Sequence, residues 1–116
     1  MQLDVNGKVY EFKFGVKFSN ELDNKLPAER DGMRVFGMSL MVNVIPALQM
    51  GSIGVLNTVL KTANQTETPK ITDADLTTFI EEHEDIEKLF DEVLKELENS
   101  NSGKLAMRAM KKNLKK

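Results

Sequence analysis

Residues 1–14, MQLDVNGKVYEFKF, predict an N-terminal β-hairpin and thereby decide the fold class. The Asn6-Gly7 dipeptide separates two segments of alternating polarity, and it favours a type I′ turn because both central residues must adopt positive φ. With this two-residue loop, Leu3 faces Tyr10, and one face carries the apolar side chains Met1, Leu3, Val5, Tyr10, Phe12 and Phe14. Since two strands alone are only marginally stable, we expect helices to cover this face.

Helical periodicity continues along the rest of the chain. Between Val16 and Leu26 apolar side chains recur at helical spacing until Pro27 ends the segment. The same pattern predicts further helices over residues 35–50, 53–63, 73–98 and from 104 onward. The expected fold is therefore α+β and mostly α-helical, with a two-stranded N-terminal hairpin packed on five to six helices.

Capping residues mark several of the expected helix ends. Gly51 is suited to end the apolar helix, and Ser52 to cap the next one. Thr72 with Asp75 resembles a capping box in which Asp replaces the usual Glu. Three segments lack helical periodicity, and we expect a polar loop, a linker within the domain and a break before the last helix: 27–34, 64–70 and 99–103.

The chain length fits one folded domain. A chain of 116 residues can bury roughly two thirds of its unfolded surface in a single core. We expect a globular domain over residues 1–103, followed by a basic C-terminal helix or tail over 104–116. The 41% hydrophobic and 29% charged residues are typical of a folded, water-soluble protein rather than a disordered one.

Neither a disulfide nor a membrane span is expected. The absence of Cys excludes disulfides and thiolate metal sites, and it suits a reducing cytoplasm. The most apolar stretch, residues 35–50, is shorter than the roughly 20 residues that a membrane helix needs. Ser39, Asn43 and Pro46 also interrupt it, so we interpret it as a buried helix.

The sign of the charge reverses near the end of the sequence. Residues 81–98 hold nine of the 18 acidic residues against two lysines, whereas residues 103–116 hold six Lys or Arg and no acid. The acidic segment also has an apolar stripe that needs a partner surface, formed by Ile86, Leu89, Phe90, Val93, Leu94 and Leu97. This arrangement indicates protein binding rather than catalysis.

Few residues are suited to catalysis or to holding a cofactor. His83 is the only imidazole, and it lies among acidic residues with no second His and no Cys in the chain. A solvated His on an outer helix face explains this pattern better than a metal ligand or a general base does. No nucleotide-binding or acyl-transfer motif occurs. We therefore expect no enzyme activity, no catalytic residue, no metal and no cofactor.

The cationic segment 104–116 has three interpretations: contact with nucleic-acid phosphates, a solvated tail, or docking on an acidic protein surface. The acidic remainder of the chain and the lack of neighbouring stacking aromatics argue against nucleic acid. No bulky aromatic residue flanks the lysines, which argues against a helix that lies on a membrane. Solvation and protein docking both stay open.

Methionine is abundant around the apolar helix. Four of the seven Met residues cluster there: Met33, Met38, Met41 and Met50. Thioether side chains adapt both to irregular cores and to the variable apolar helices of a partner. The cluster is thus compatible with core filling and with partner binding.

Both ends of the sequence resemble a known family. The stretches NGKVYEFKFGVKFSNELD (residues 6–23) and EDIEKLFDEVLKELENSN (residues 84–101), followed by a lysine-rich terminus, resemble the tail assembly chaperones of long-tailed phages and prophages of Gram-positive bacteria. The resemblance implies a helical protein with an N-terminal hairpin that acts in the cytoplasm of the bacterial host. It implies two partners, because such a chaperone binds the tape measure protein, keeps it soluble and helps recruit tail tube protein. It also implies absence from the finished virion.

The contact surface is expected on the apolar helix and the basic terminus. A tape measure protein is long, helical and apolar, so its chaperone must cover apolar stripes reversibly. We expect an apolar surface for this client or for a second copy of the chain, together with docking charge, from Phe36, Met38, Met41, Val42, Lys111, Lys112 and Lys115. Two other classes stay open: a small cytoplasmic regulatory or nucleic-acid-binding protein that uses the basic terminus, and a structural head-tail component.

Overall fold

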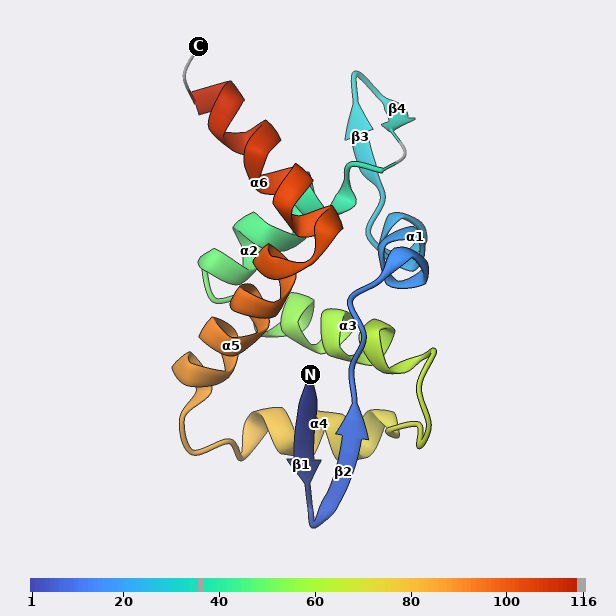
Figure 1. Cartoon of the computed structure of the whole chain (residues 1–116), viewed down its shortest axis with the longest axis vertical. Helices are drawn as coiled ribbons and strands as arrows, with labels where there is room; N and C mark the ends of the chain where they lie inside the picture. Colours follow the sequence, from blue (N-terminus) through green and yellow to red (C-terminus); the bar gives the residue numbers. More distant parts are fainter. Residues whose placement is uncertain (36, 115–116) are drawn as a thin grey trace.

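The computed structural model describes residues 1–35 and 37–114, which form an elongated α+β protein of 47 × 24 × 24 Å (Figure 1). An N-terminal hairpin lies at one end of the long axis, and the C-terminal helix α6 (Asn101–Leu114) lies at the other. Between them lie α1 (Val16–Lys25), η1 (Leu40–Val44), α2 (Ile45–Gln49), α3 (Ile53–Asn64), α4 (Asp73–Glu81) and α5 (Ile86–Asn99). The expected fold class, mostly helical with an N-terminal hairpin, is confirmed.

The N-terminal hairpin forms as its sequence predicts. Strands β1 (Gln2–Val5) and β2 (Lys8–Glu11) pair antiparallel with Leu3 opposite Tyr10, in the predicted register. Asn6 and Gly7 have φ of 58° and 83°, the positive values that a type I′ turn requires. The face that holds Val5, Tyr10 and Phe12 is buried against α3 and α4, which supply the cover that two strands need.

A second hairpin replaces the polar loop that was predicted over residues 27–34. Strands β3 (Ala28–Arg30) and β4 (Met33–Val35) pair around Asp31 and Gly32, whose φ values are 53° and 78°. The loop prediction was wrong because Asp-Gly provides the same positive-φ turn as Asn6-Gly7. This hairpin extends from the end of the molecule that also carries α6 (Figure 1).

The apolar helix begins later than predicted. Val35 still belongs to β4, and the helical segment starts at Ser39, where η1 leads directly into α2. The widened turn has a local cause, because Pro46 carries no N–H, and the N–H of Ile45 bonds the carbonyl of Leu40 five residues back. Gly51 ends α2 with a φ of 81°, as predicted.

The predicted caps of α3 and α4 are confirmed. Ser52 Oγ accepts a hydrogen bond from Val55 N (3.3 Å), and Thr72 Oγ1 accepts one from Asp75 N (3.1 Å). The continuous helix predicted over 73–98 is wrong, because the chain turns at residues 82–85. There the Asp85 carboxylate accepts from the N–H of Lys88 (3.2 Å) and begins α5 as a separate helix.

The break before the last helix is shorter than predicted. Helix α6 begins at Asn101 rather than at residue 104, and Ser100 alone separates it from α5. Ser100 Oγ accepts from Gly103 N (3.0 Å) and donates to the Leu97 carbonyl (2.6 Å). Helix α6 then crosses η1 and packs Ala106, Met107 and Met110 against the core, so the basic segment up to residue 114 is helical.

Candidate partner-binding groove

A groove of about 290 Å³ lies between α1, η1 and α6, and we call it the α1/η1/α6 groove. The α1 side of the lining is polar, whereas the side formed by residues 37–41 and by α6 is mostly apolar, with Ser102 as a polar member. Its main lining residues are Ser19, Asn20, Asp23, Met38, Leu40, Met41 and Leu105. The volume lies at the lower limit of small-molecule sites, and it has room for a few apolar side chains of a partner.

Asp23 fixes the apolar wall relative to α1. Its carboxylate accepts hydrogen bonds from Gly37 N (2.9 Å) and Ser39 N (3.1 Å), the two backbone groups that flank Met38. Arg34 Nη2 donates to the Asp23 carbonyl (2.8 Å), which ties the β3–β4 hairpin to the same point. The polar residues of the apolar helix also bond the residue that follows α1, because Ser39 Oγ and Asn43 Nδ2 donate to the Leu26 carbonyl at 2.6 and 2.8 Å.

Removal of the Asp23 carboxylate should therefore loosen this wall. We expect Asp23→Ala to lower the free energy of unfolding by about 1 to 2 kcal/mol, because two backbone N–H groups lose their acceptors. Urea unfolding followed by circular dichroism measures this change. Glu21→Ala, at an exposed position of the same helix, is the matched control and should stay within about 0.5 kcal/mol of the wild type. Equal effects of the two variants would contradict the role given to Asp23.

The residues predicted as a contact surface do not all lie together. Met38 and Met41 line the groove, and Val42 in the next position is 47% exposed. Lys111 and Lys112 are exposed on α6 and line a separate cavity with Glu98 and Met107. Phe36 and Lys115 lie outside the described residues.

Of the groove residues, sequence reasoning predicted only Met38 and Met41, and it missed the others, among them Leu105 and Ser19. Leu105 is 66% exposed on α6, and Ser19 Oγ is buried with no hydrogen-bond partner among the described residues. The sequence carries a weak signal for Leu105, an apolar side chain beside the stripe of Met107 and Met110. It carries none for Ser19, because this residue becomes part of a groove only where α6, packed on η1, lines the same cavity as α1.

His83 makes two local contacts. His83 Nδ1 accepts from Asp85 N (3.1 Å), and its ring packs edge-on against Phe79 at 5.2 Å. Within residues 1–35 and 37–114, no group of three or more His, Asp or Glu side chains is arranged to hold a metal ion. Of the helices in this described part, none has both the length and the apolar character to cross a membrane.

A small helical fold with an apolar groove and exposed charged faces is typical of protein-binding modules. The comparison with family models identifies its biological setting, because the model of the phage tail assembly chaperone proteins matches residues 2–112. The chain belongs to this family. Comparisons with curated proteins and with solved structures give no significant match.

Proposed function

We propose that this chaperone binds the tape measure protein of its phage in the α1/η1/α6 groove and keeps it soluble. It acts by binding and not by catalysis, in the cytoplasm of the bacterial host. It helps recruit tail tube protein and leaves before the virion is complete. The observation that carries the proposal is the groove, whose apolar wall combines the half-buried Met38 and Met41 with the 66% exposed Leu105 in a chain of this family.

The groove suits one face of an amphipathic client helix. Apolar side chains at helical spacing from the client would contact Met38, Met41 and Leu105, and methionine adapts to varied shapes. The α1 wall offers the exposed side chain of Asn20 to polar groups along the same helix. Such a lining suits weak, reversible binding to many related apolar segments of the client rather than tight binding to one of them.

The exposed lysines of α6 provide the docking charge in this proposal. Lys111 and Lys112 are exposed close to the C-terminal end of α6, outside the groove itself. Val42 is 47% exposed beside Met41 and extends the apolar surface. Acidic residues next to the apolar face of a client helix would pair with these lysines, and such pairs affect association rate and specificity more than affinity.

The decisive experiment compares client binding by two variants: Met41→Asp, which places a negative charge in the groove, and Met50→Asp, which places the same charge outside it. A tape measure protein from the same genetic element is co-expressed with this chain, and soluble yield and co-purification are measured. We expect Met41→Asp to weaken binding at least about tenfold, because a carboxylate would be desolvated at the centre of the contact. Met50→Asp is the matched control, since Met50 is 88% exposed and lies outside the groove lining.

Each result has a defined meaning. If Met41→Asp folds and binds the client as well as the wild type does, the groove is not the client site. If the wild-type chain leaves the client insoluble and does not co-purify, the chaperone role towards this client is wrong. Purified virions that retain the chain would indicate a structural head-tail component instead.

A further inference from the structure

The α1/η1/α6 groove has one charged group in its described lining, the carboxylate of Asp23. This residue is half-buried, and its two oxygens each accept one backbone N–H, from Gly37 (2.9 Å) and from Ser39 (3.1 Å). Both donors are neutral, so they satisfy the oxygens without cancelling the charge. Among the described residues the only ion pair joins Lys61 to Asp73 (3.1 Å), so no cationic side chain there pairs with Asp23.

The lysines of α1 lie away from this wall of the groove. Lys25 Nζ donates to Thr62 Oγ1 on α3 (3.1 Å), and Lys17 lines a different cavity at the start of α1. On the groove side, Asp23 is accompanied by the uncharged side chains of Ser19 and Asn20. The α1 wall of the groove is therefore acidic.

A client that fills the groove must compensate this charge. Apolar side chains packed on Met38 and Met41 would shield Asp23 from water, and a shielded carboxylate without a cation destabilises the complex. A lysine or arginine of the client removes this penalty. Its aliphatic part packs on apolar side chains while its charged end reaches the carboxylate. The groove is thus suited to select its client by charge as well as by apolar shape.

We propose that the client segment is an amphipathic helix with Lys or Arg along the flank that faces α1, and that Asp23 recognises this flank. The inference rests on the proposed function, since it names the chemistry of the segment that the groove binds. Its basis is charge complementarity to the one charged group in the described lining. A segment with Asp or Glu on the same flank is repelled, which adds specificity.

The α6 side of the groove adds a direction to this binding. Leu105, Ala109 and Lys112 follow one another at spacings of four and three, so Lys112 lies on the groove side of α6, toward its C-terminal end. The two sides of the groove therefore have opposite charge. A client helix with basic residues on one flank and acidic residues on the other can satisfy both sides in only one direction along the groove.

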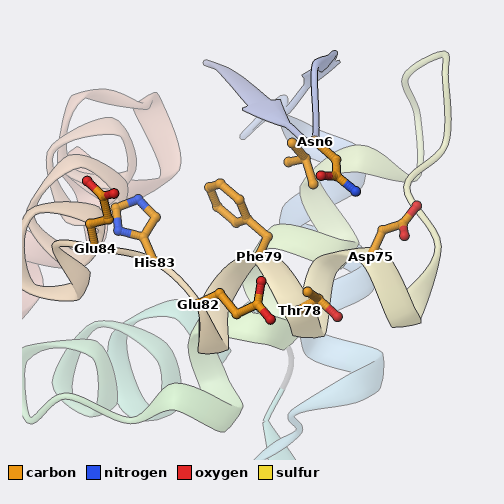
Figure 2. Close-up of a pocket in the computed structure, with 8 residues that line it drawn as sticks. Asn6, Asp75, Thr78, Phe79, Glu82, His83 and Glu84 are labelled. Carbon is orange, nitrogen blue, oxygen red and sulfur yellow. The ribbon is translucent and has the colours of Figure 1, made fainter.

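A more acidic cavity elsewhere is less suited to this recognition. It measures about 480 Å³ and lies between the turn of the N-terminal hairpin and α4, where Figure 2 shows Asp75 at one side of Phe79 and Glu82 and Glu84 at the other. All three acidic residues are exposed, whereas Asp23 is half-buried. Exposed ion pairs contribute little to binding, because water and salt screen them. We therefore use Glu82 as a control for general charge effects.

Peptides of the tape measure protein test the proposal. Overlapping peptides of about 20 residues, roughly 30 Å of helix, cover the tape measure protein from the same genetic element and are probed with the full chain. We expect the tightest binders to have Lys or Arg along one flank of their apolar stripe. Exchange of these basic residues for glutamine in the tightest binder should weaken its binding to the wild type about fivefold, and less at high salt. Fluorescence anisotropy of the labelled peptide measures this change.

Asn20→Lys cancels the charge of the α1 wall and leaves Asp23 in place. Asn20 is exposed, lines the groove and lies three residues before Asp23, so a lysine there can pair with the carboxylate. For this variant the glutamine exchange in the peptide should change binding by less than about twofold. Asn20→Gln separates the length of the new side chain from its charge. Glu82→Gln should bind both peptides as the wild type does, and circular dichroism checks the folding of each variant.

Met41→Asp separates this inference from the proposed function. If Met41→Asp weakens peptide binding but the glutamine exchange leaves binding to the wild type unchanged, the groove binds the client and the selection by Asp23 is wrong. Equal losses with the wild type and with Asn20→Lys also overturn the selection. If no tape measure peptide binds, or if Met41→Asp has no effect, the proposed function fails together with the inference. Peptides from this chain's own sequence overturn the proposal if they bind more tightly than any tape measure peptide.

Discussion

Gly103→Ala is expected to lower the free energy of unfolding by about 3 kcal/mol, at the upper end of the range for overpacking. A Cβ atom at this position would lie 1.6 Å from the Leu97 carbonyl oxygen and 2.6 Å from its carbon. Both are backbone atoms at the end of α5, so no side-chain rotation relieves the clash. The chain must open the α5–α6 junction, which breaks the Ser100 cap and pulls Met107 and Met110 from the core.

Denaturant unfolding measures this loss, and amide hydrogen exchange over α6 shows whether the junction opens. Gly54→Ala is the matched control, because a Cβ there meets nothing within 4 Å and the site lies inside α3. That substitution should raise the free energy of unfolding by roughly 0.5 to 1 kcal/mol through helix propensity. A loss below about 1 kcal/mol for Gly103→Ala would mean that the close approach of α6 to α5 is not needed for stability.

Local features of the fold were predictable because their causes lie within a few residues. The turn at Asn6-Gly7 sets the register of the N-terminal hairpin. Ser52 and Thr72 each cap the helix that follows by accepting a hydrogen bond from the backbone N–H three residues ahead. The break at residue 100 was predicted too long, because residues 99–103 lack helical periodicity and Gly103 was included in the break. It is instead a helical residue that is small enough for two helices to cross.

The β3–β4 hairpin was missed because its stability is not local. Its strands have three residues each and no apolar alternation, with Ala28 buried and Met33 73% exposed. The turn signal, Asp31-Gly32, was present but had no apolar strands beside it. Contacts from elsewhere help hold the hairpin, among them the bonds from Arg34 to the Asp23 carbonyl (2.8 Å) and to Asn24 Oδ1 (3.2 Å).

The sequence predicted some of the residues that line the groove but not the groove itself. Met38 and Met41 stand out as apolar residues in a Met-rich helix, and both line it. Ser19 and Leu105 lie more than 80 residues apart in the sequence, and their proximity depends on how α6 packs on η1. No pattern along the chain encodes that crossing. The role of these residues in partner binding stays a prediction that Met41→Asp tests.

Asn64→Ala is expected to lower the free energy of unfolding by about 3 kcal/mol, because it leaves buried backbone groups without partners. The side chain is 2% exposed and joins three segments. Its Nδ2 donates to the Glu11 carbonyl (2.9 Å) and the Pro69 carbonyl (3.1 Å), and its Oδ1 accepts from Ile71 N (2.7 Å). The residue was interpreted from sequence as the start of a polar linker, yet it connects the N-terminal hairpin to both ends of that linker.

The same helix provides a control of the same chemical type. Asn57 has a buried Oδ1 with no hydrogen-bond partner among the described residues, so Asn57→Ala should change the free energy of unfolding by no more than about 0.5 kcal/mol. Denaturant unfolding of both variants gives the comparison, and hydrogen exchange of β2 amides shows whether the hairpin detaches. Equal effects at Asn57 and Asn64 would mean that the apolar packing of Tyr10 and Phe12 holds the hairpin on α3 and that the three hydrogen bonds add nothing beyond what water provides.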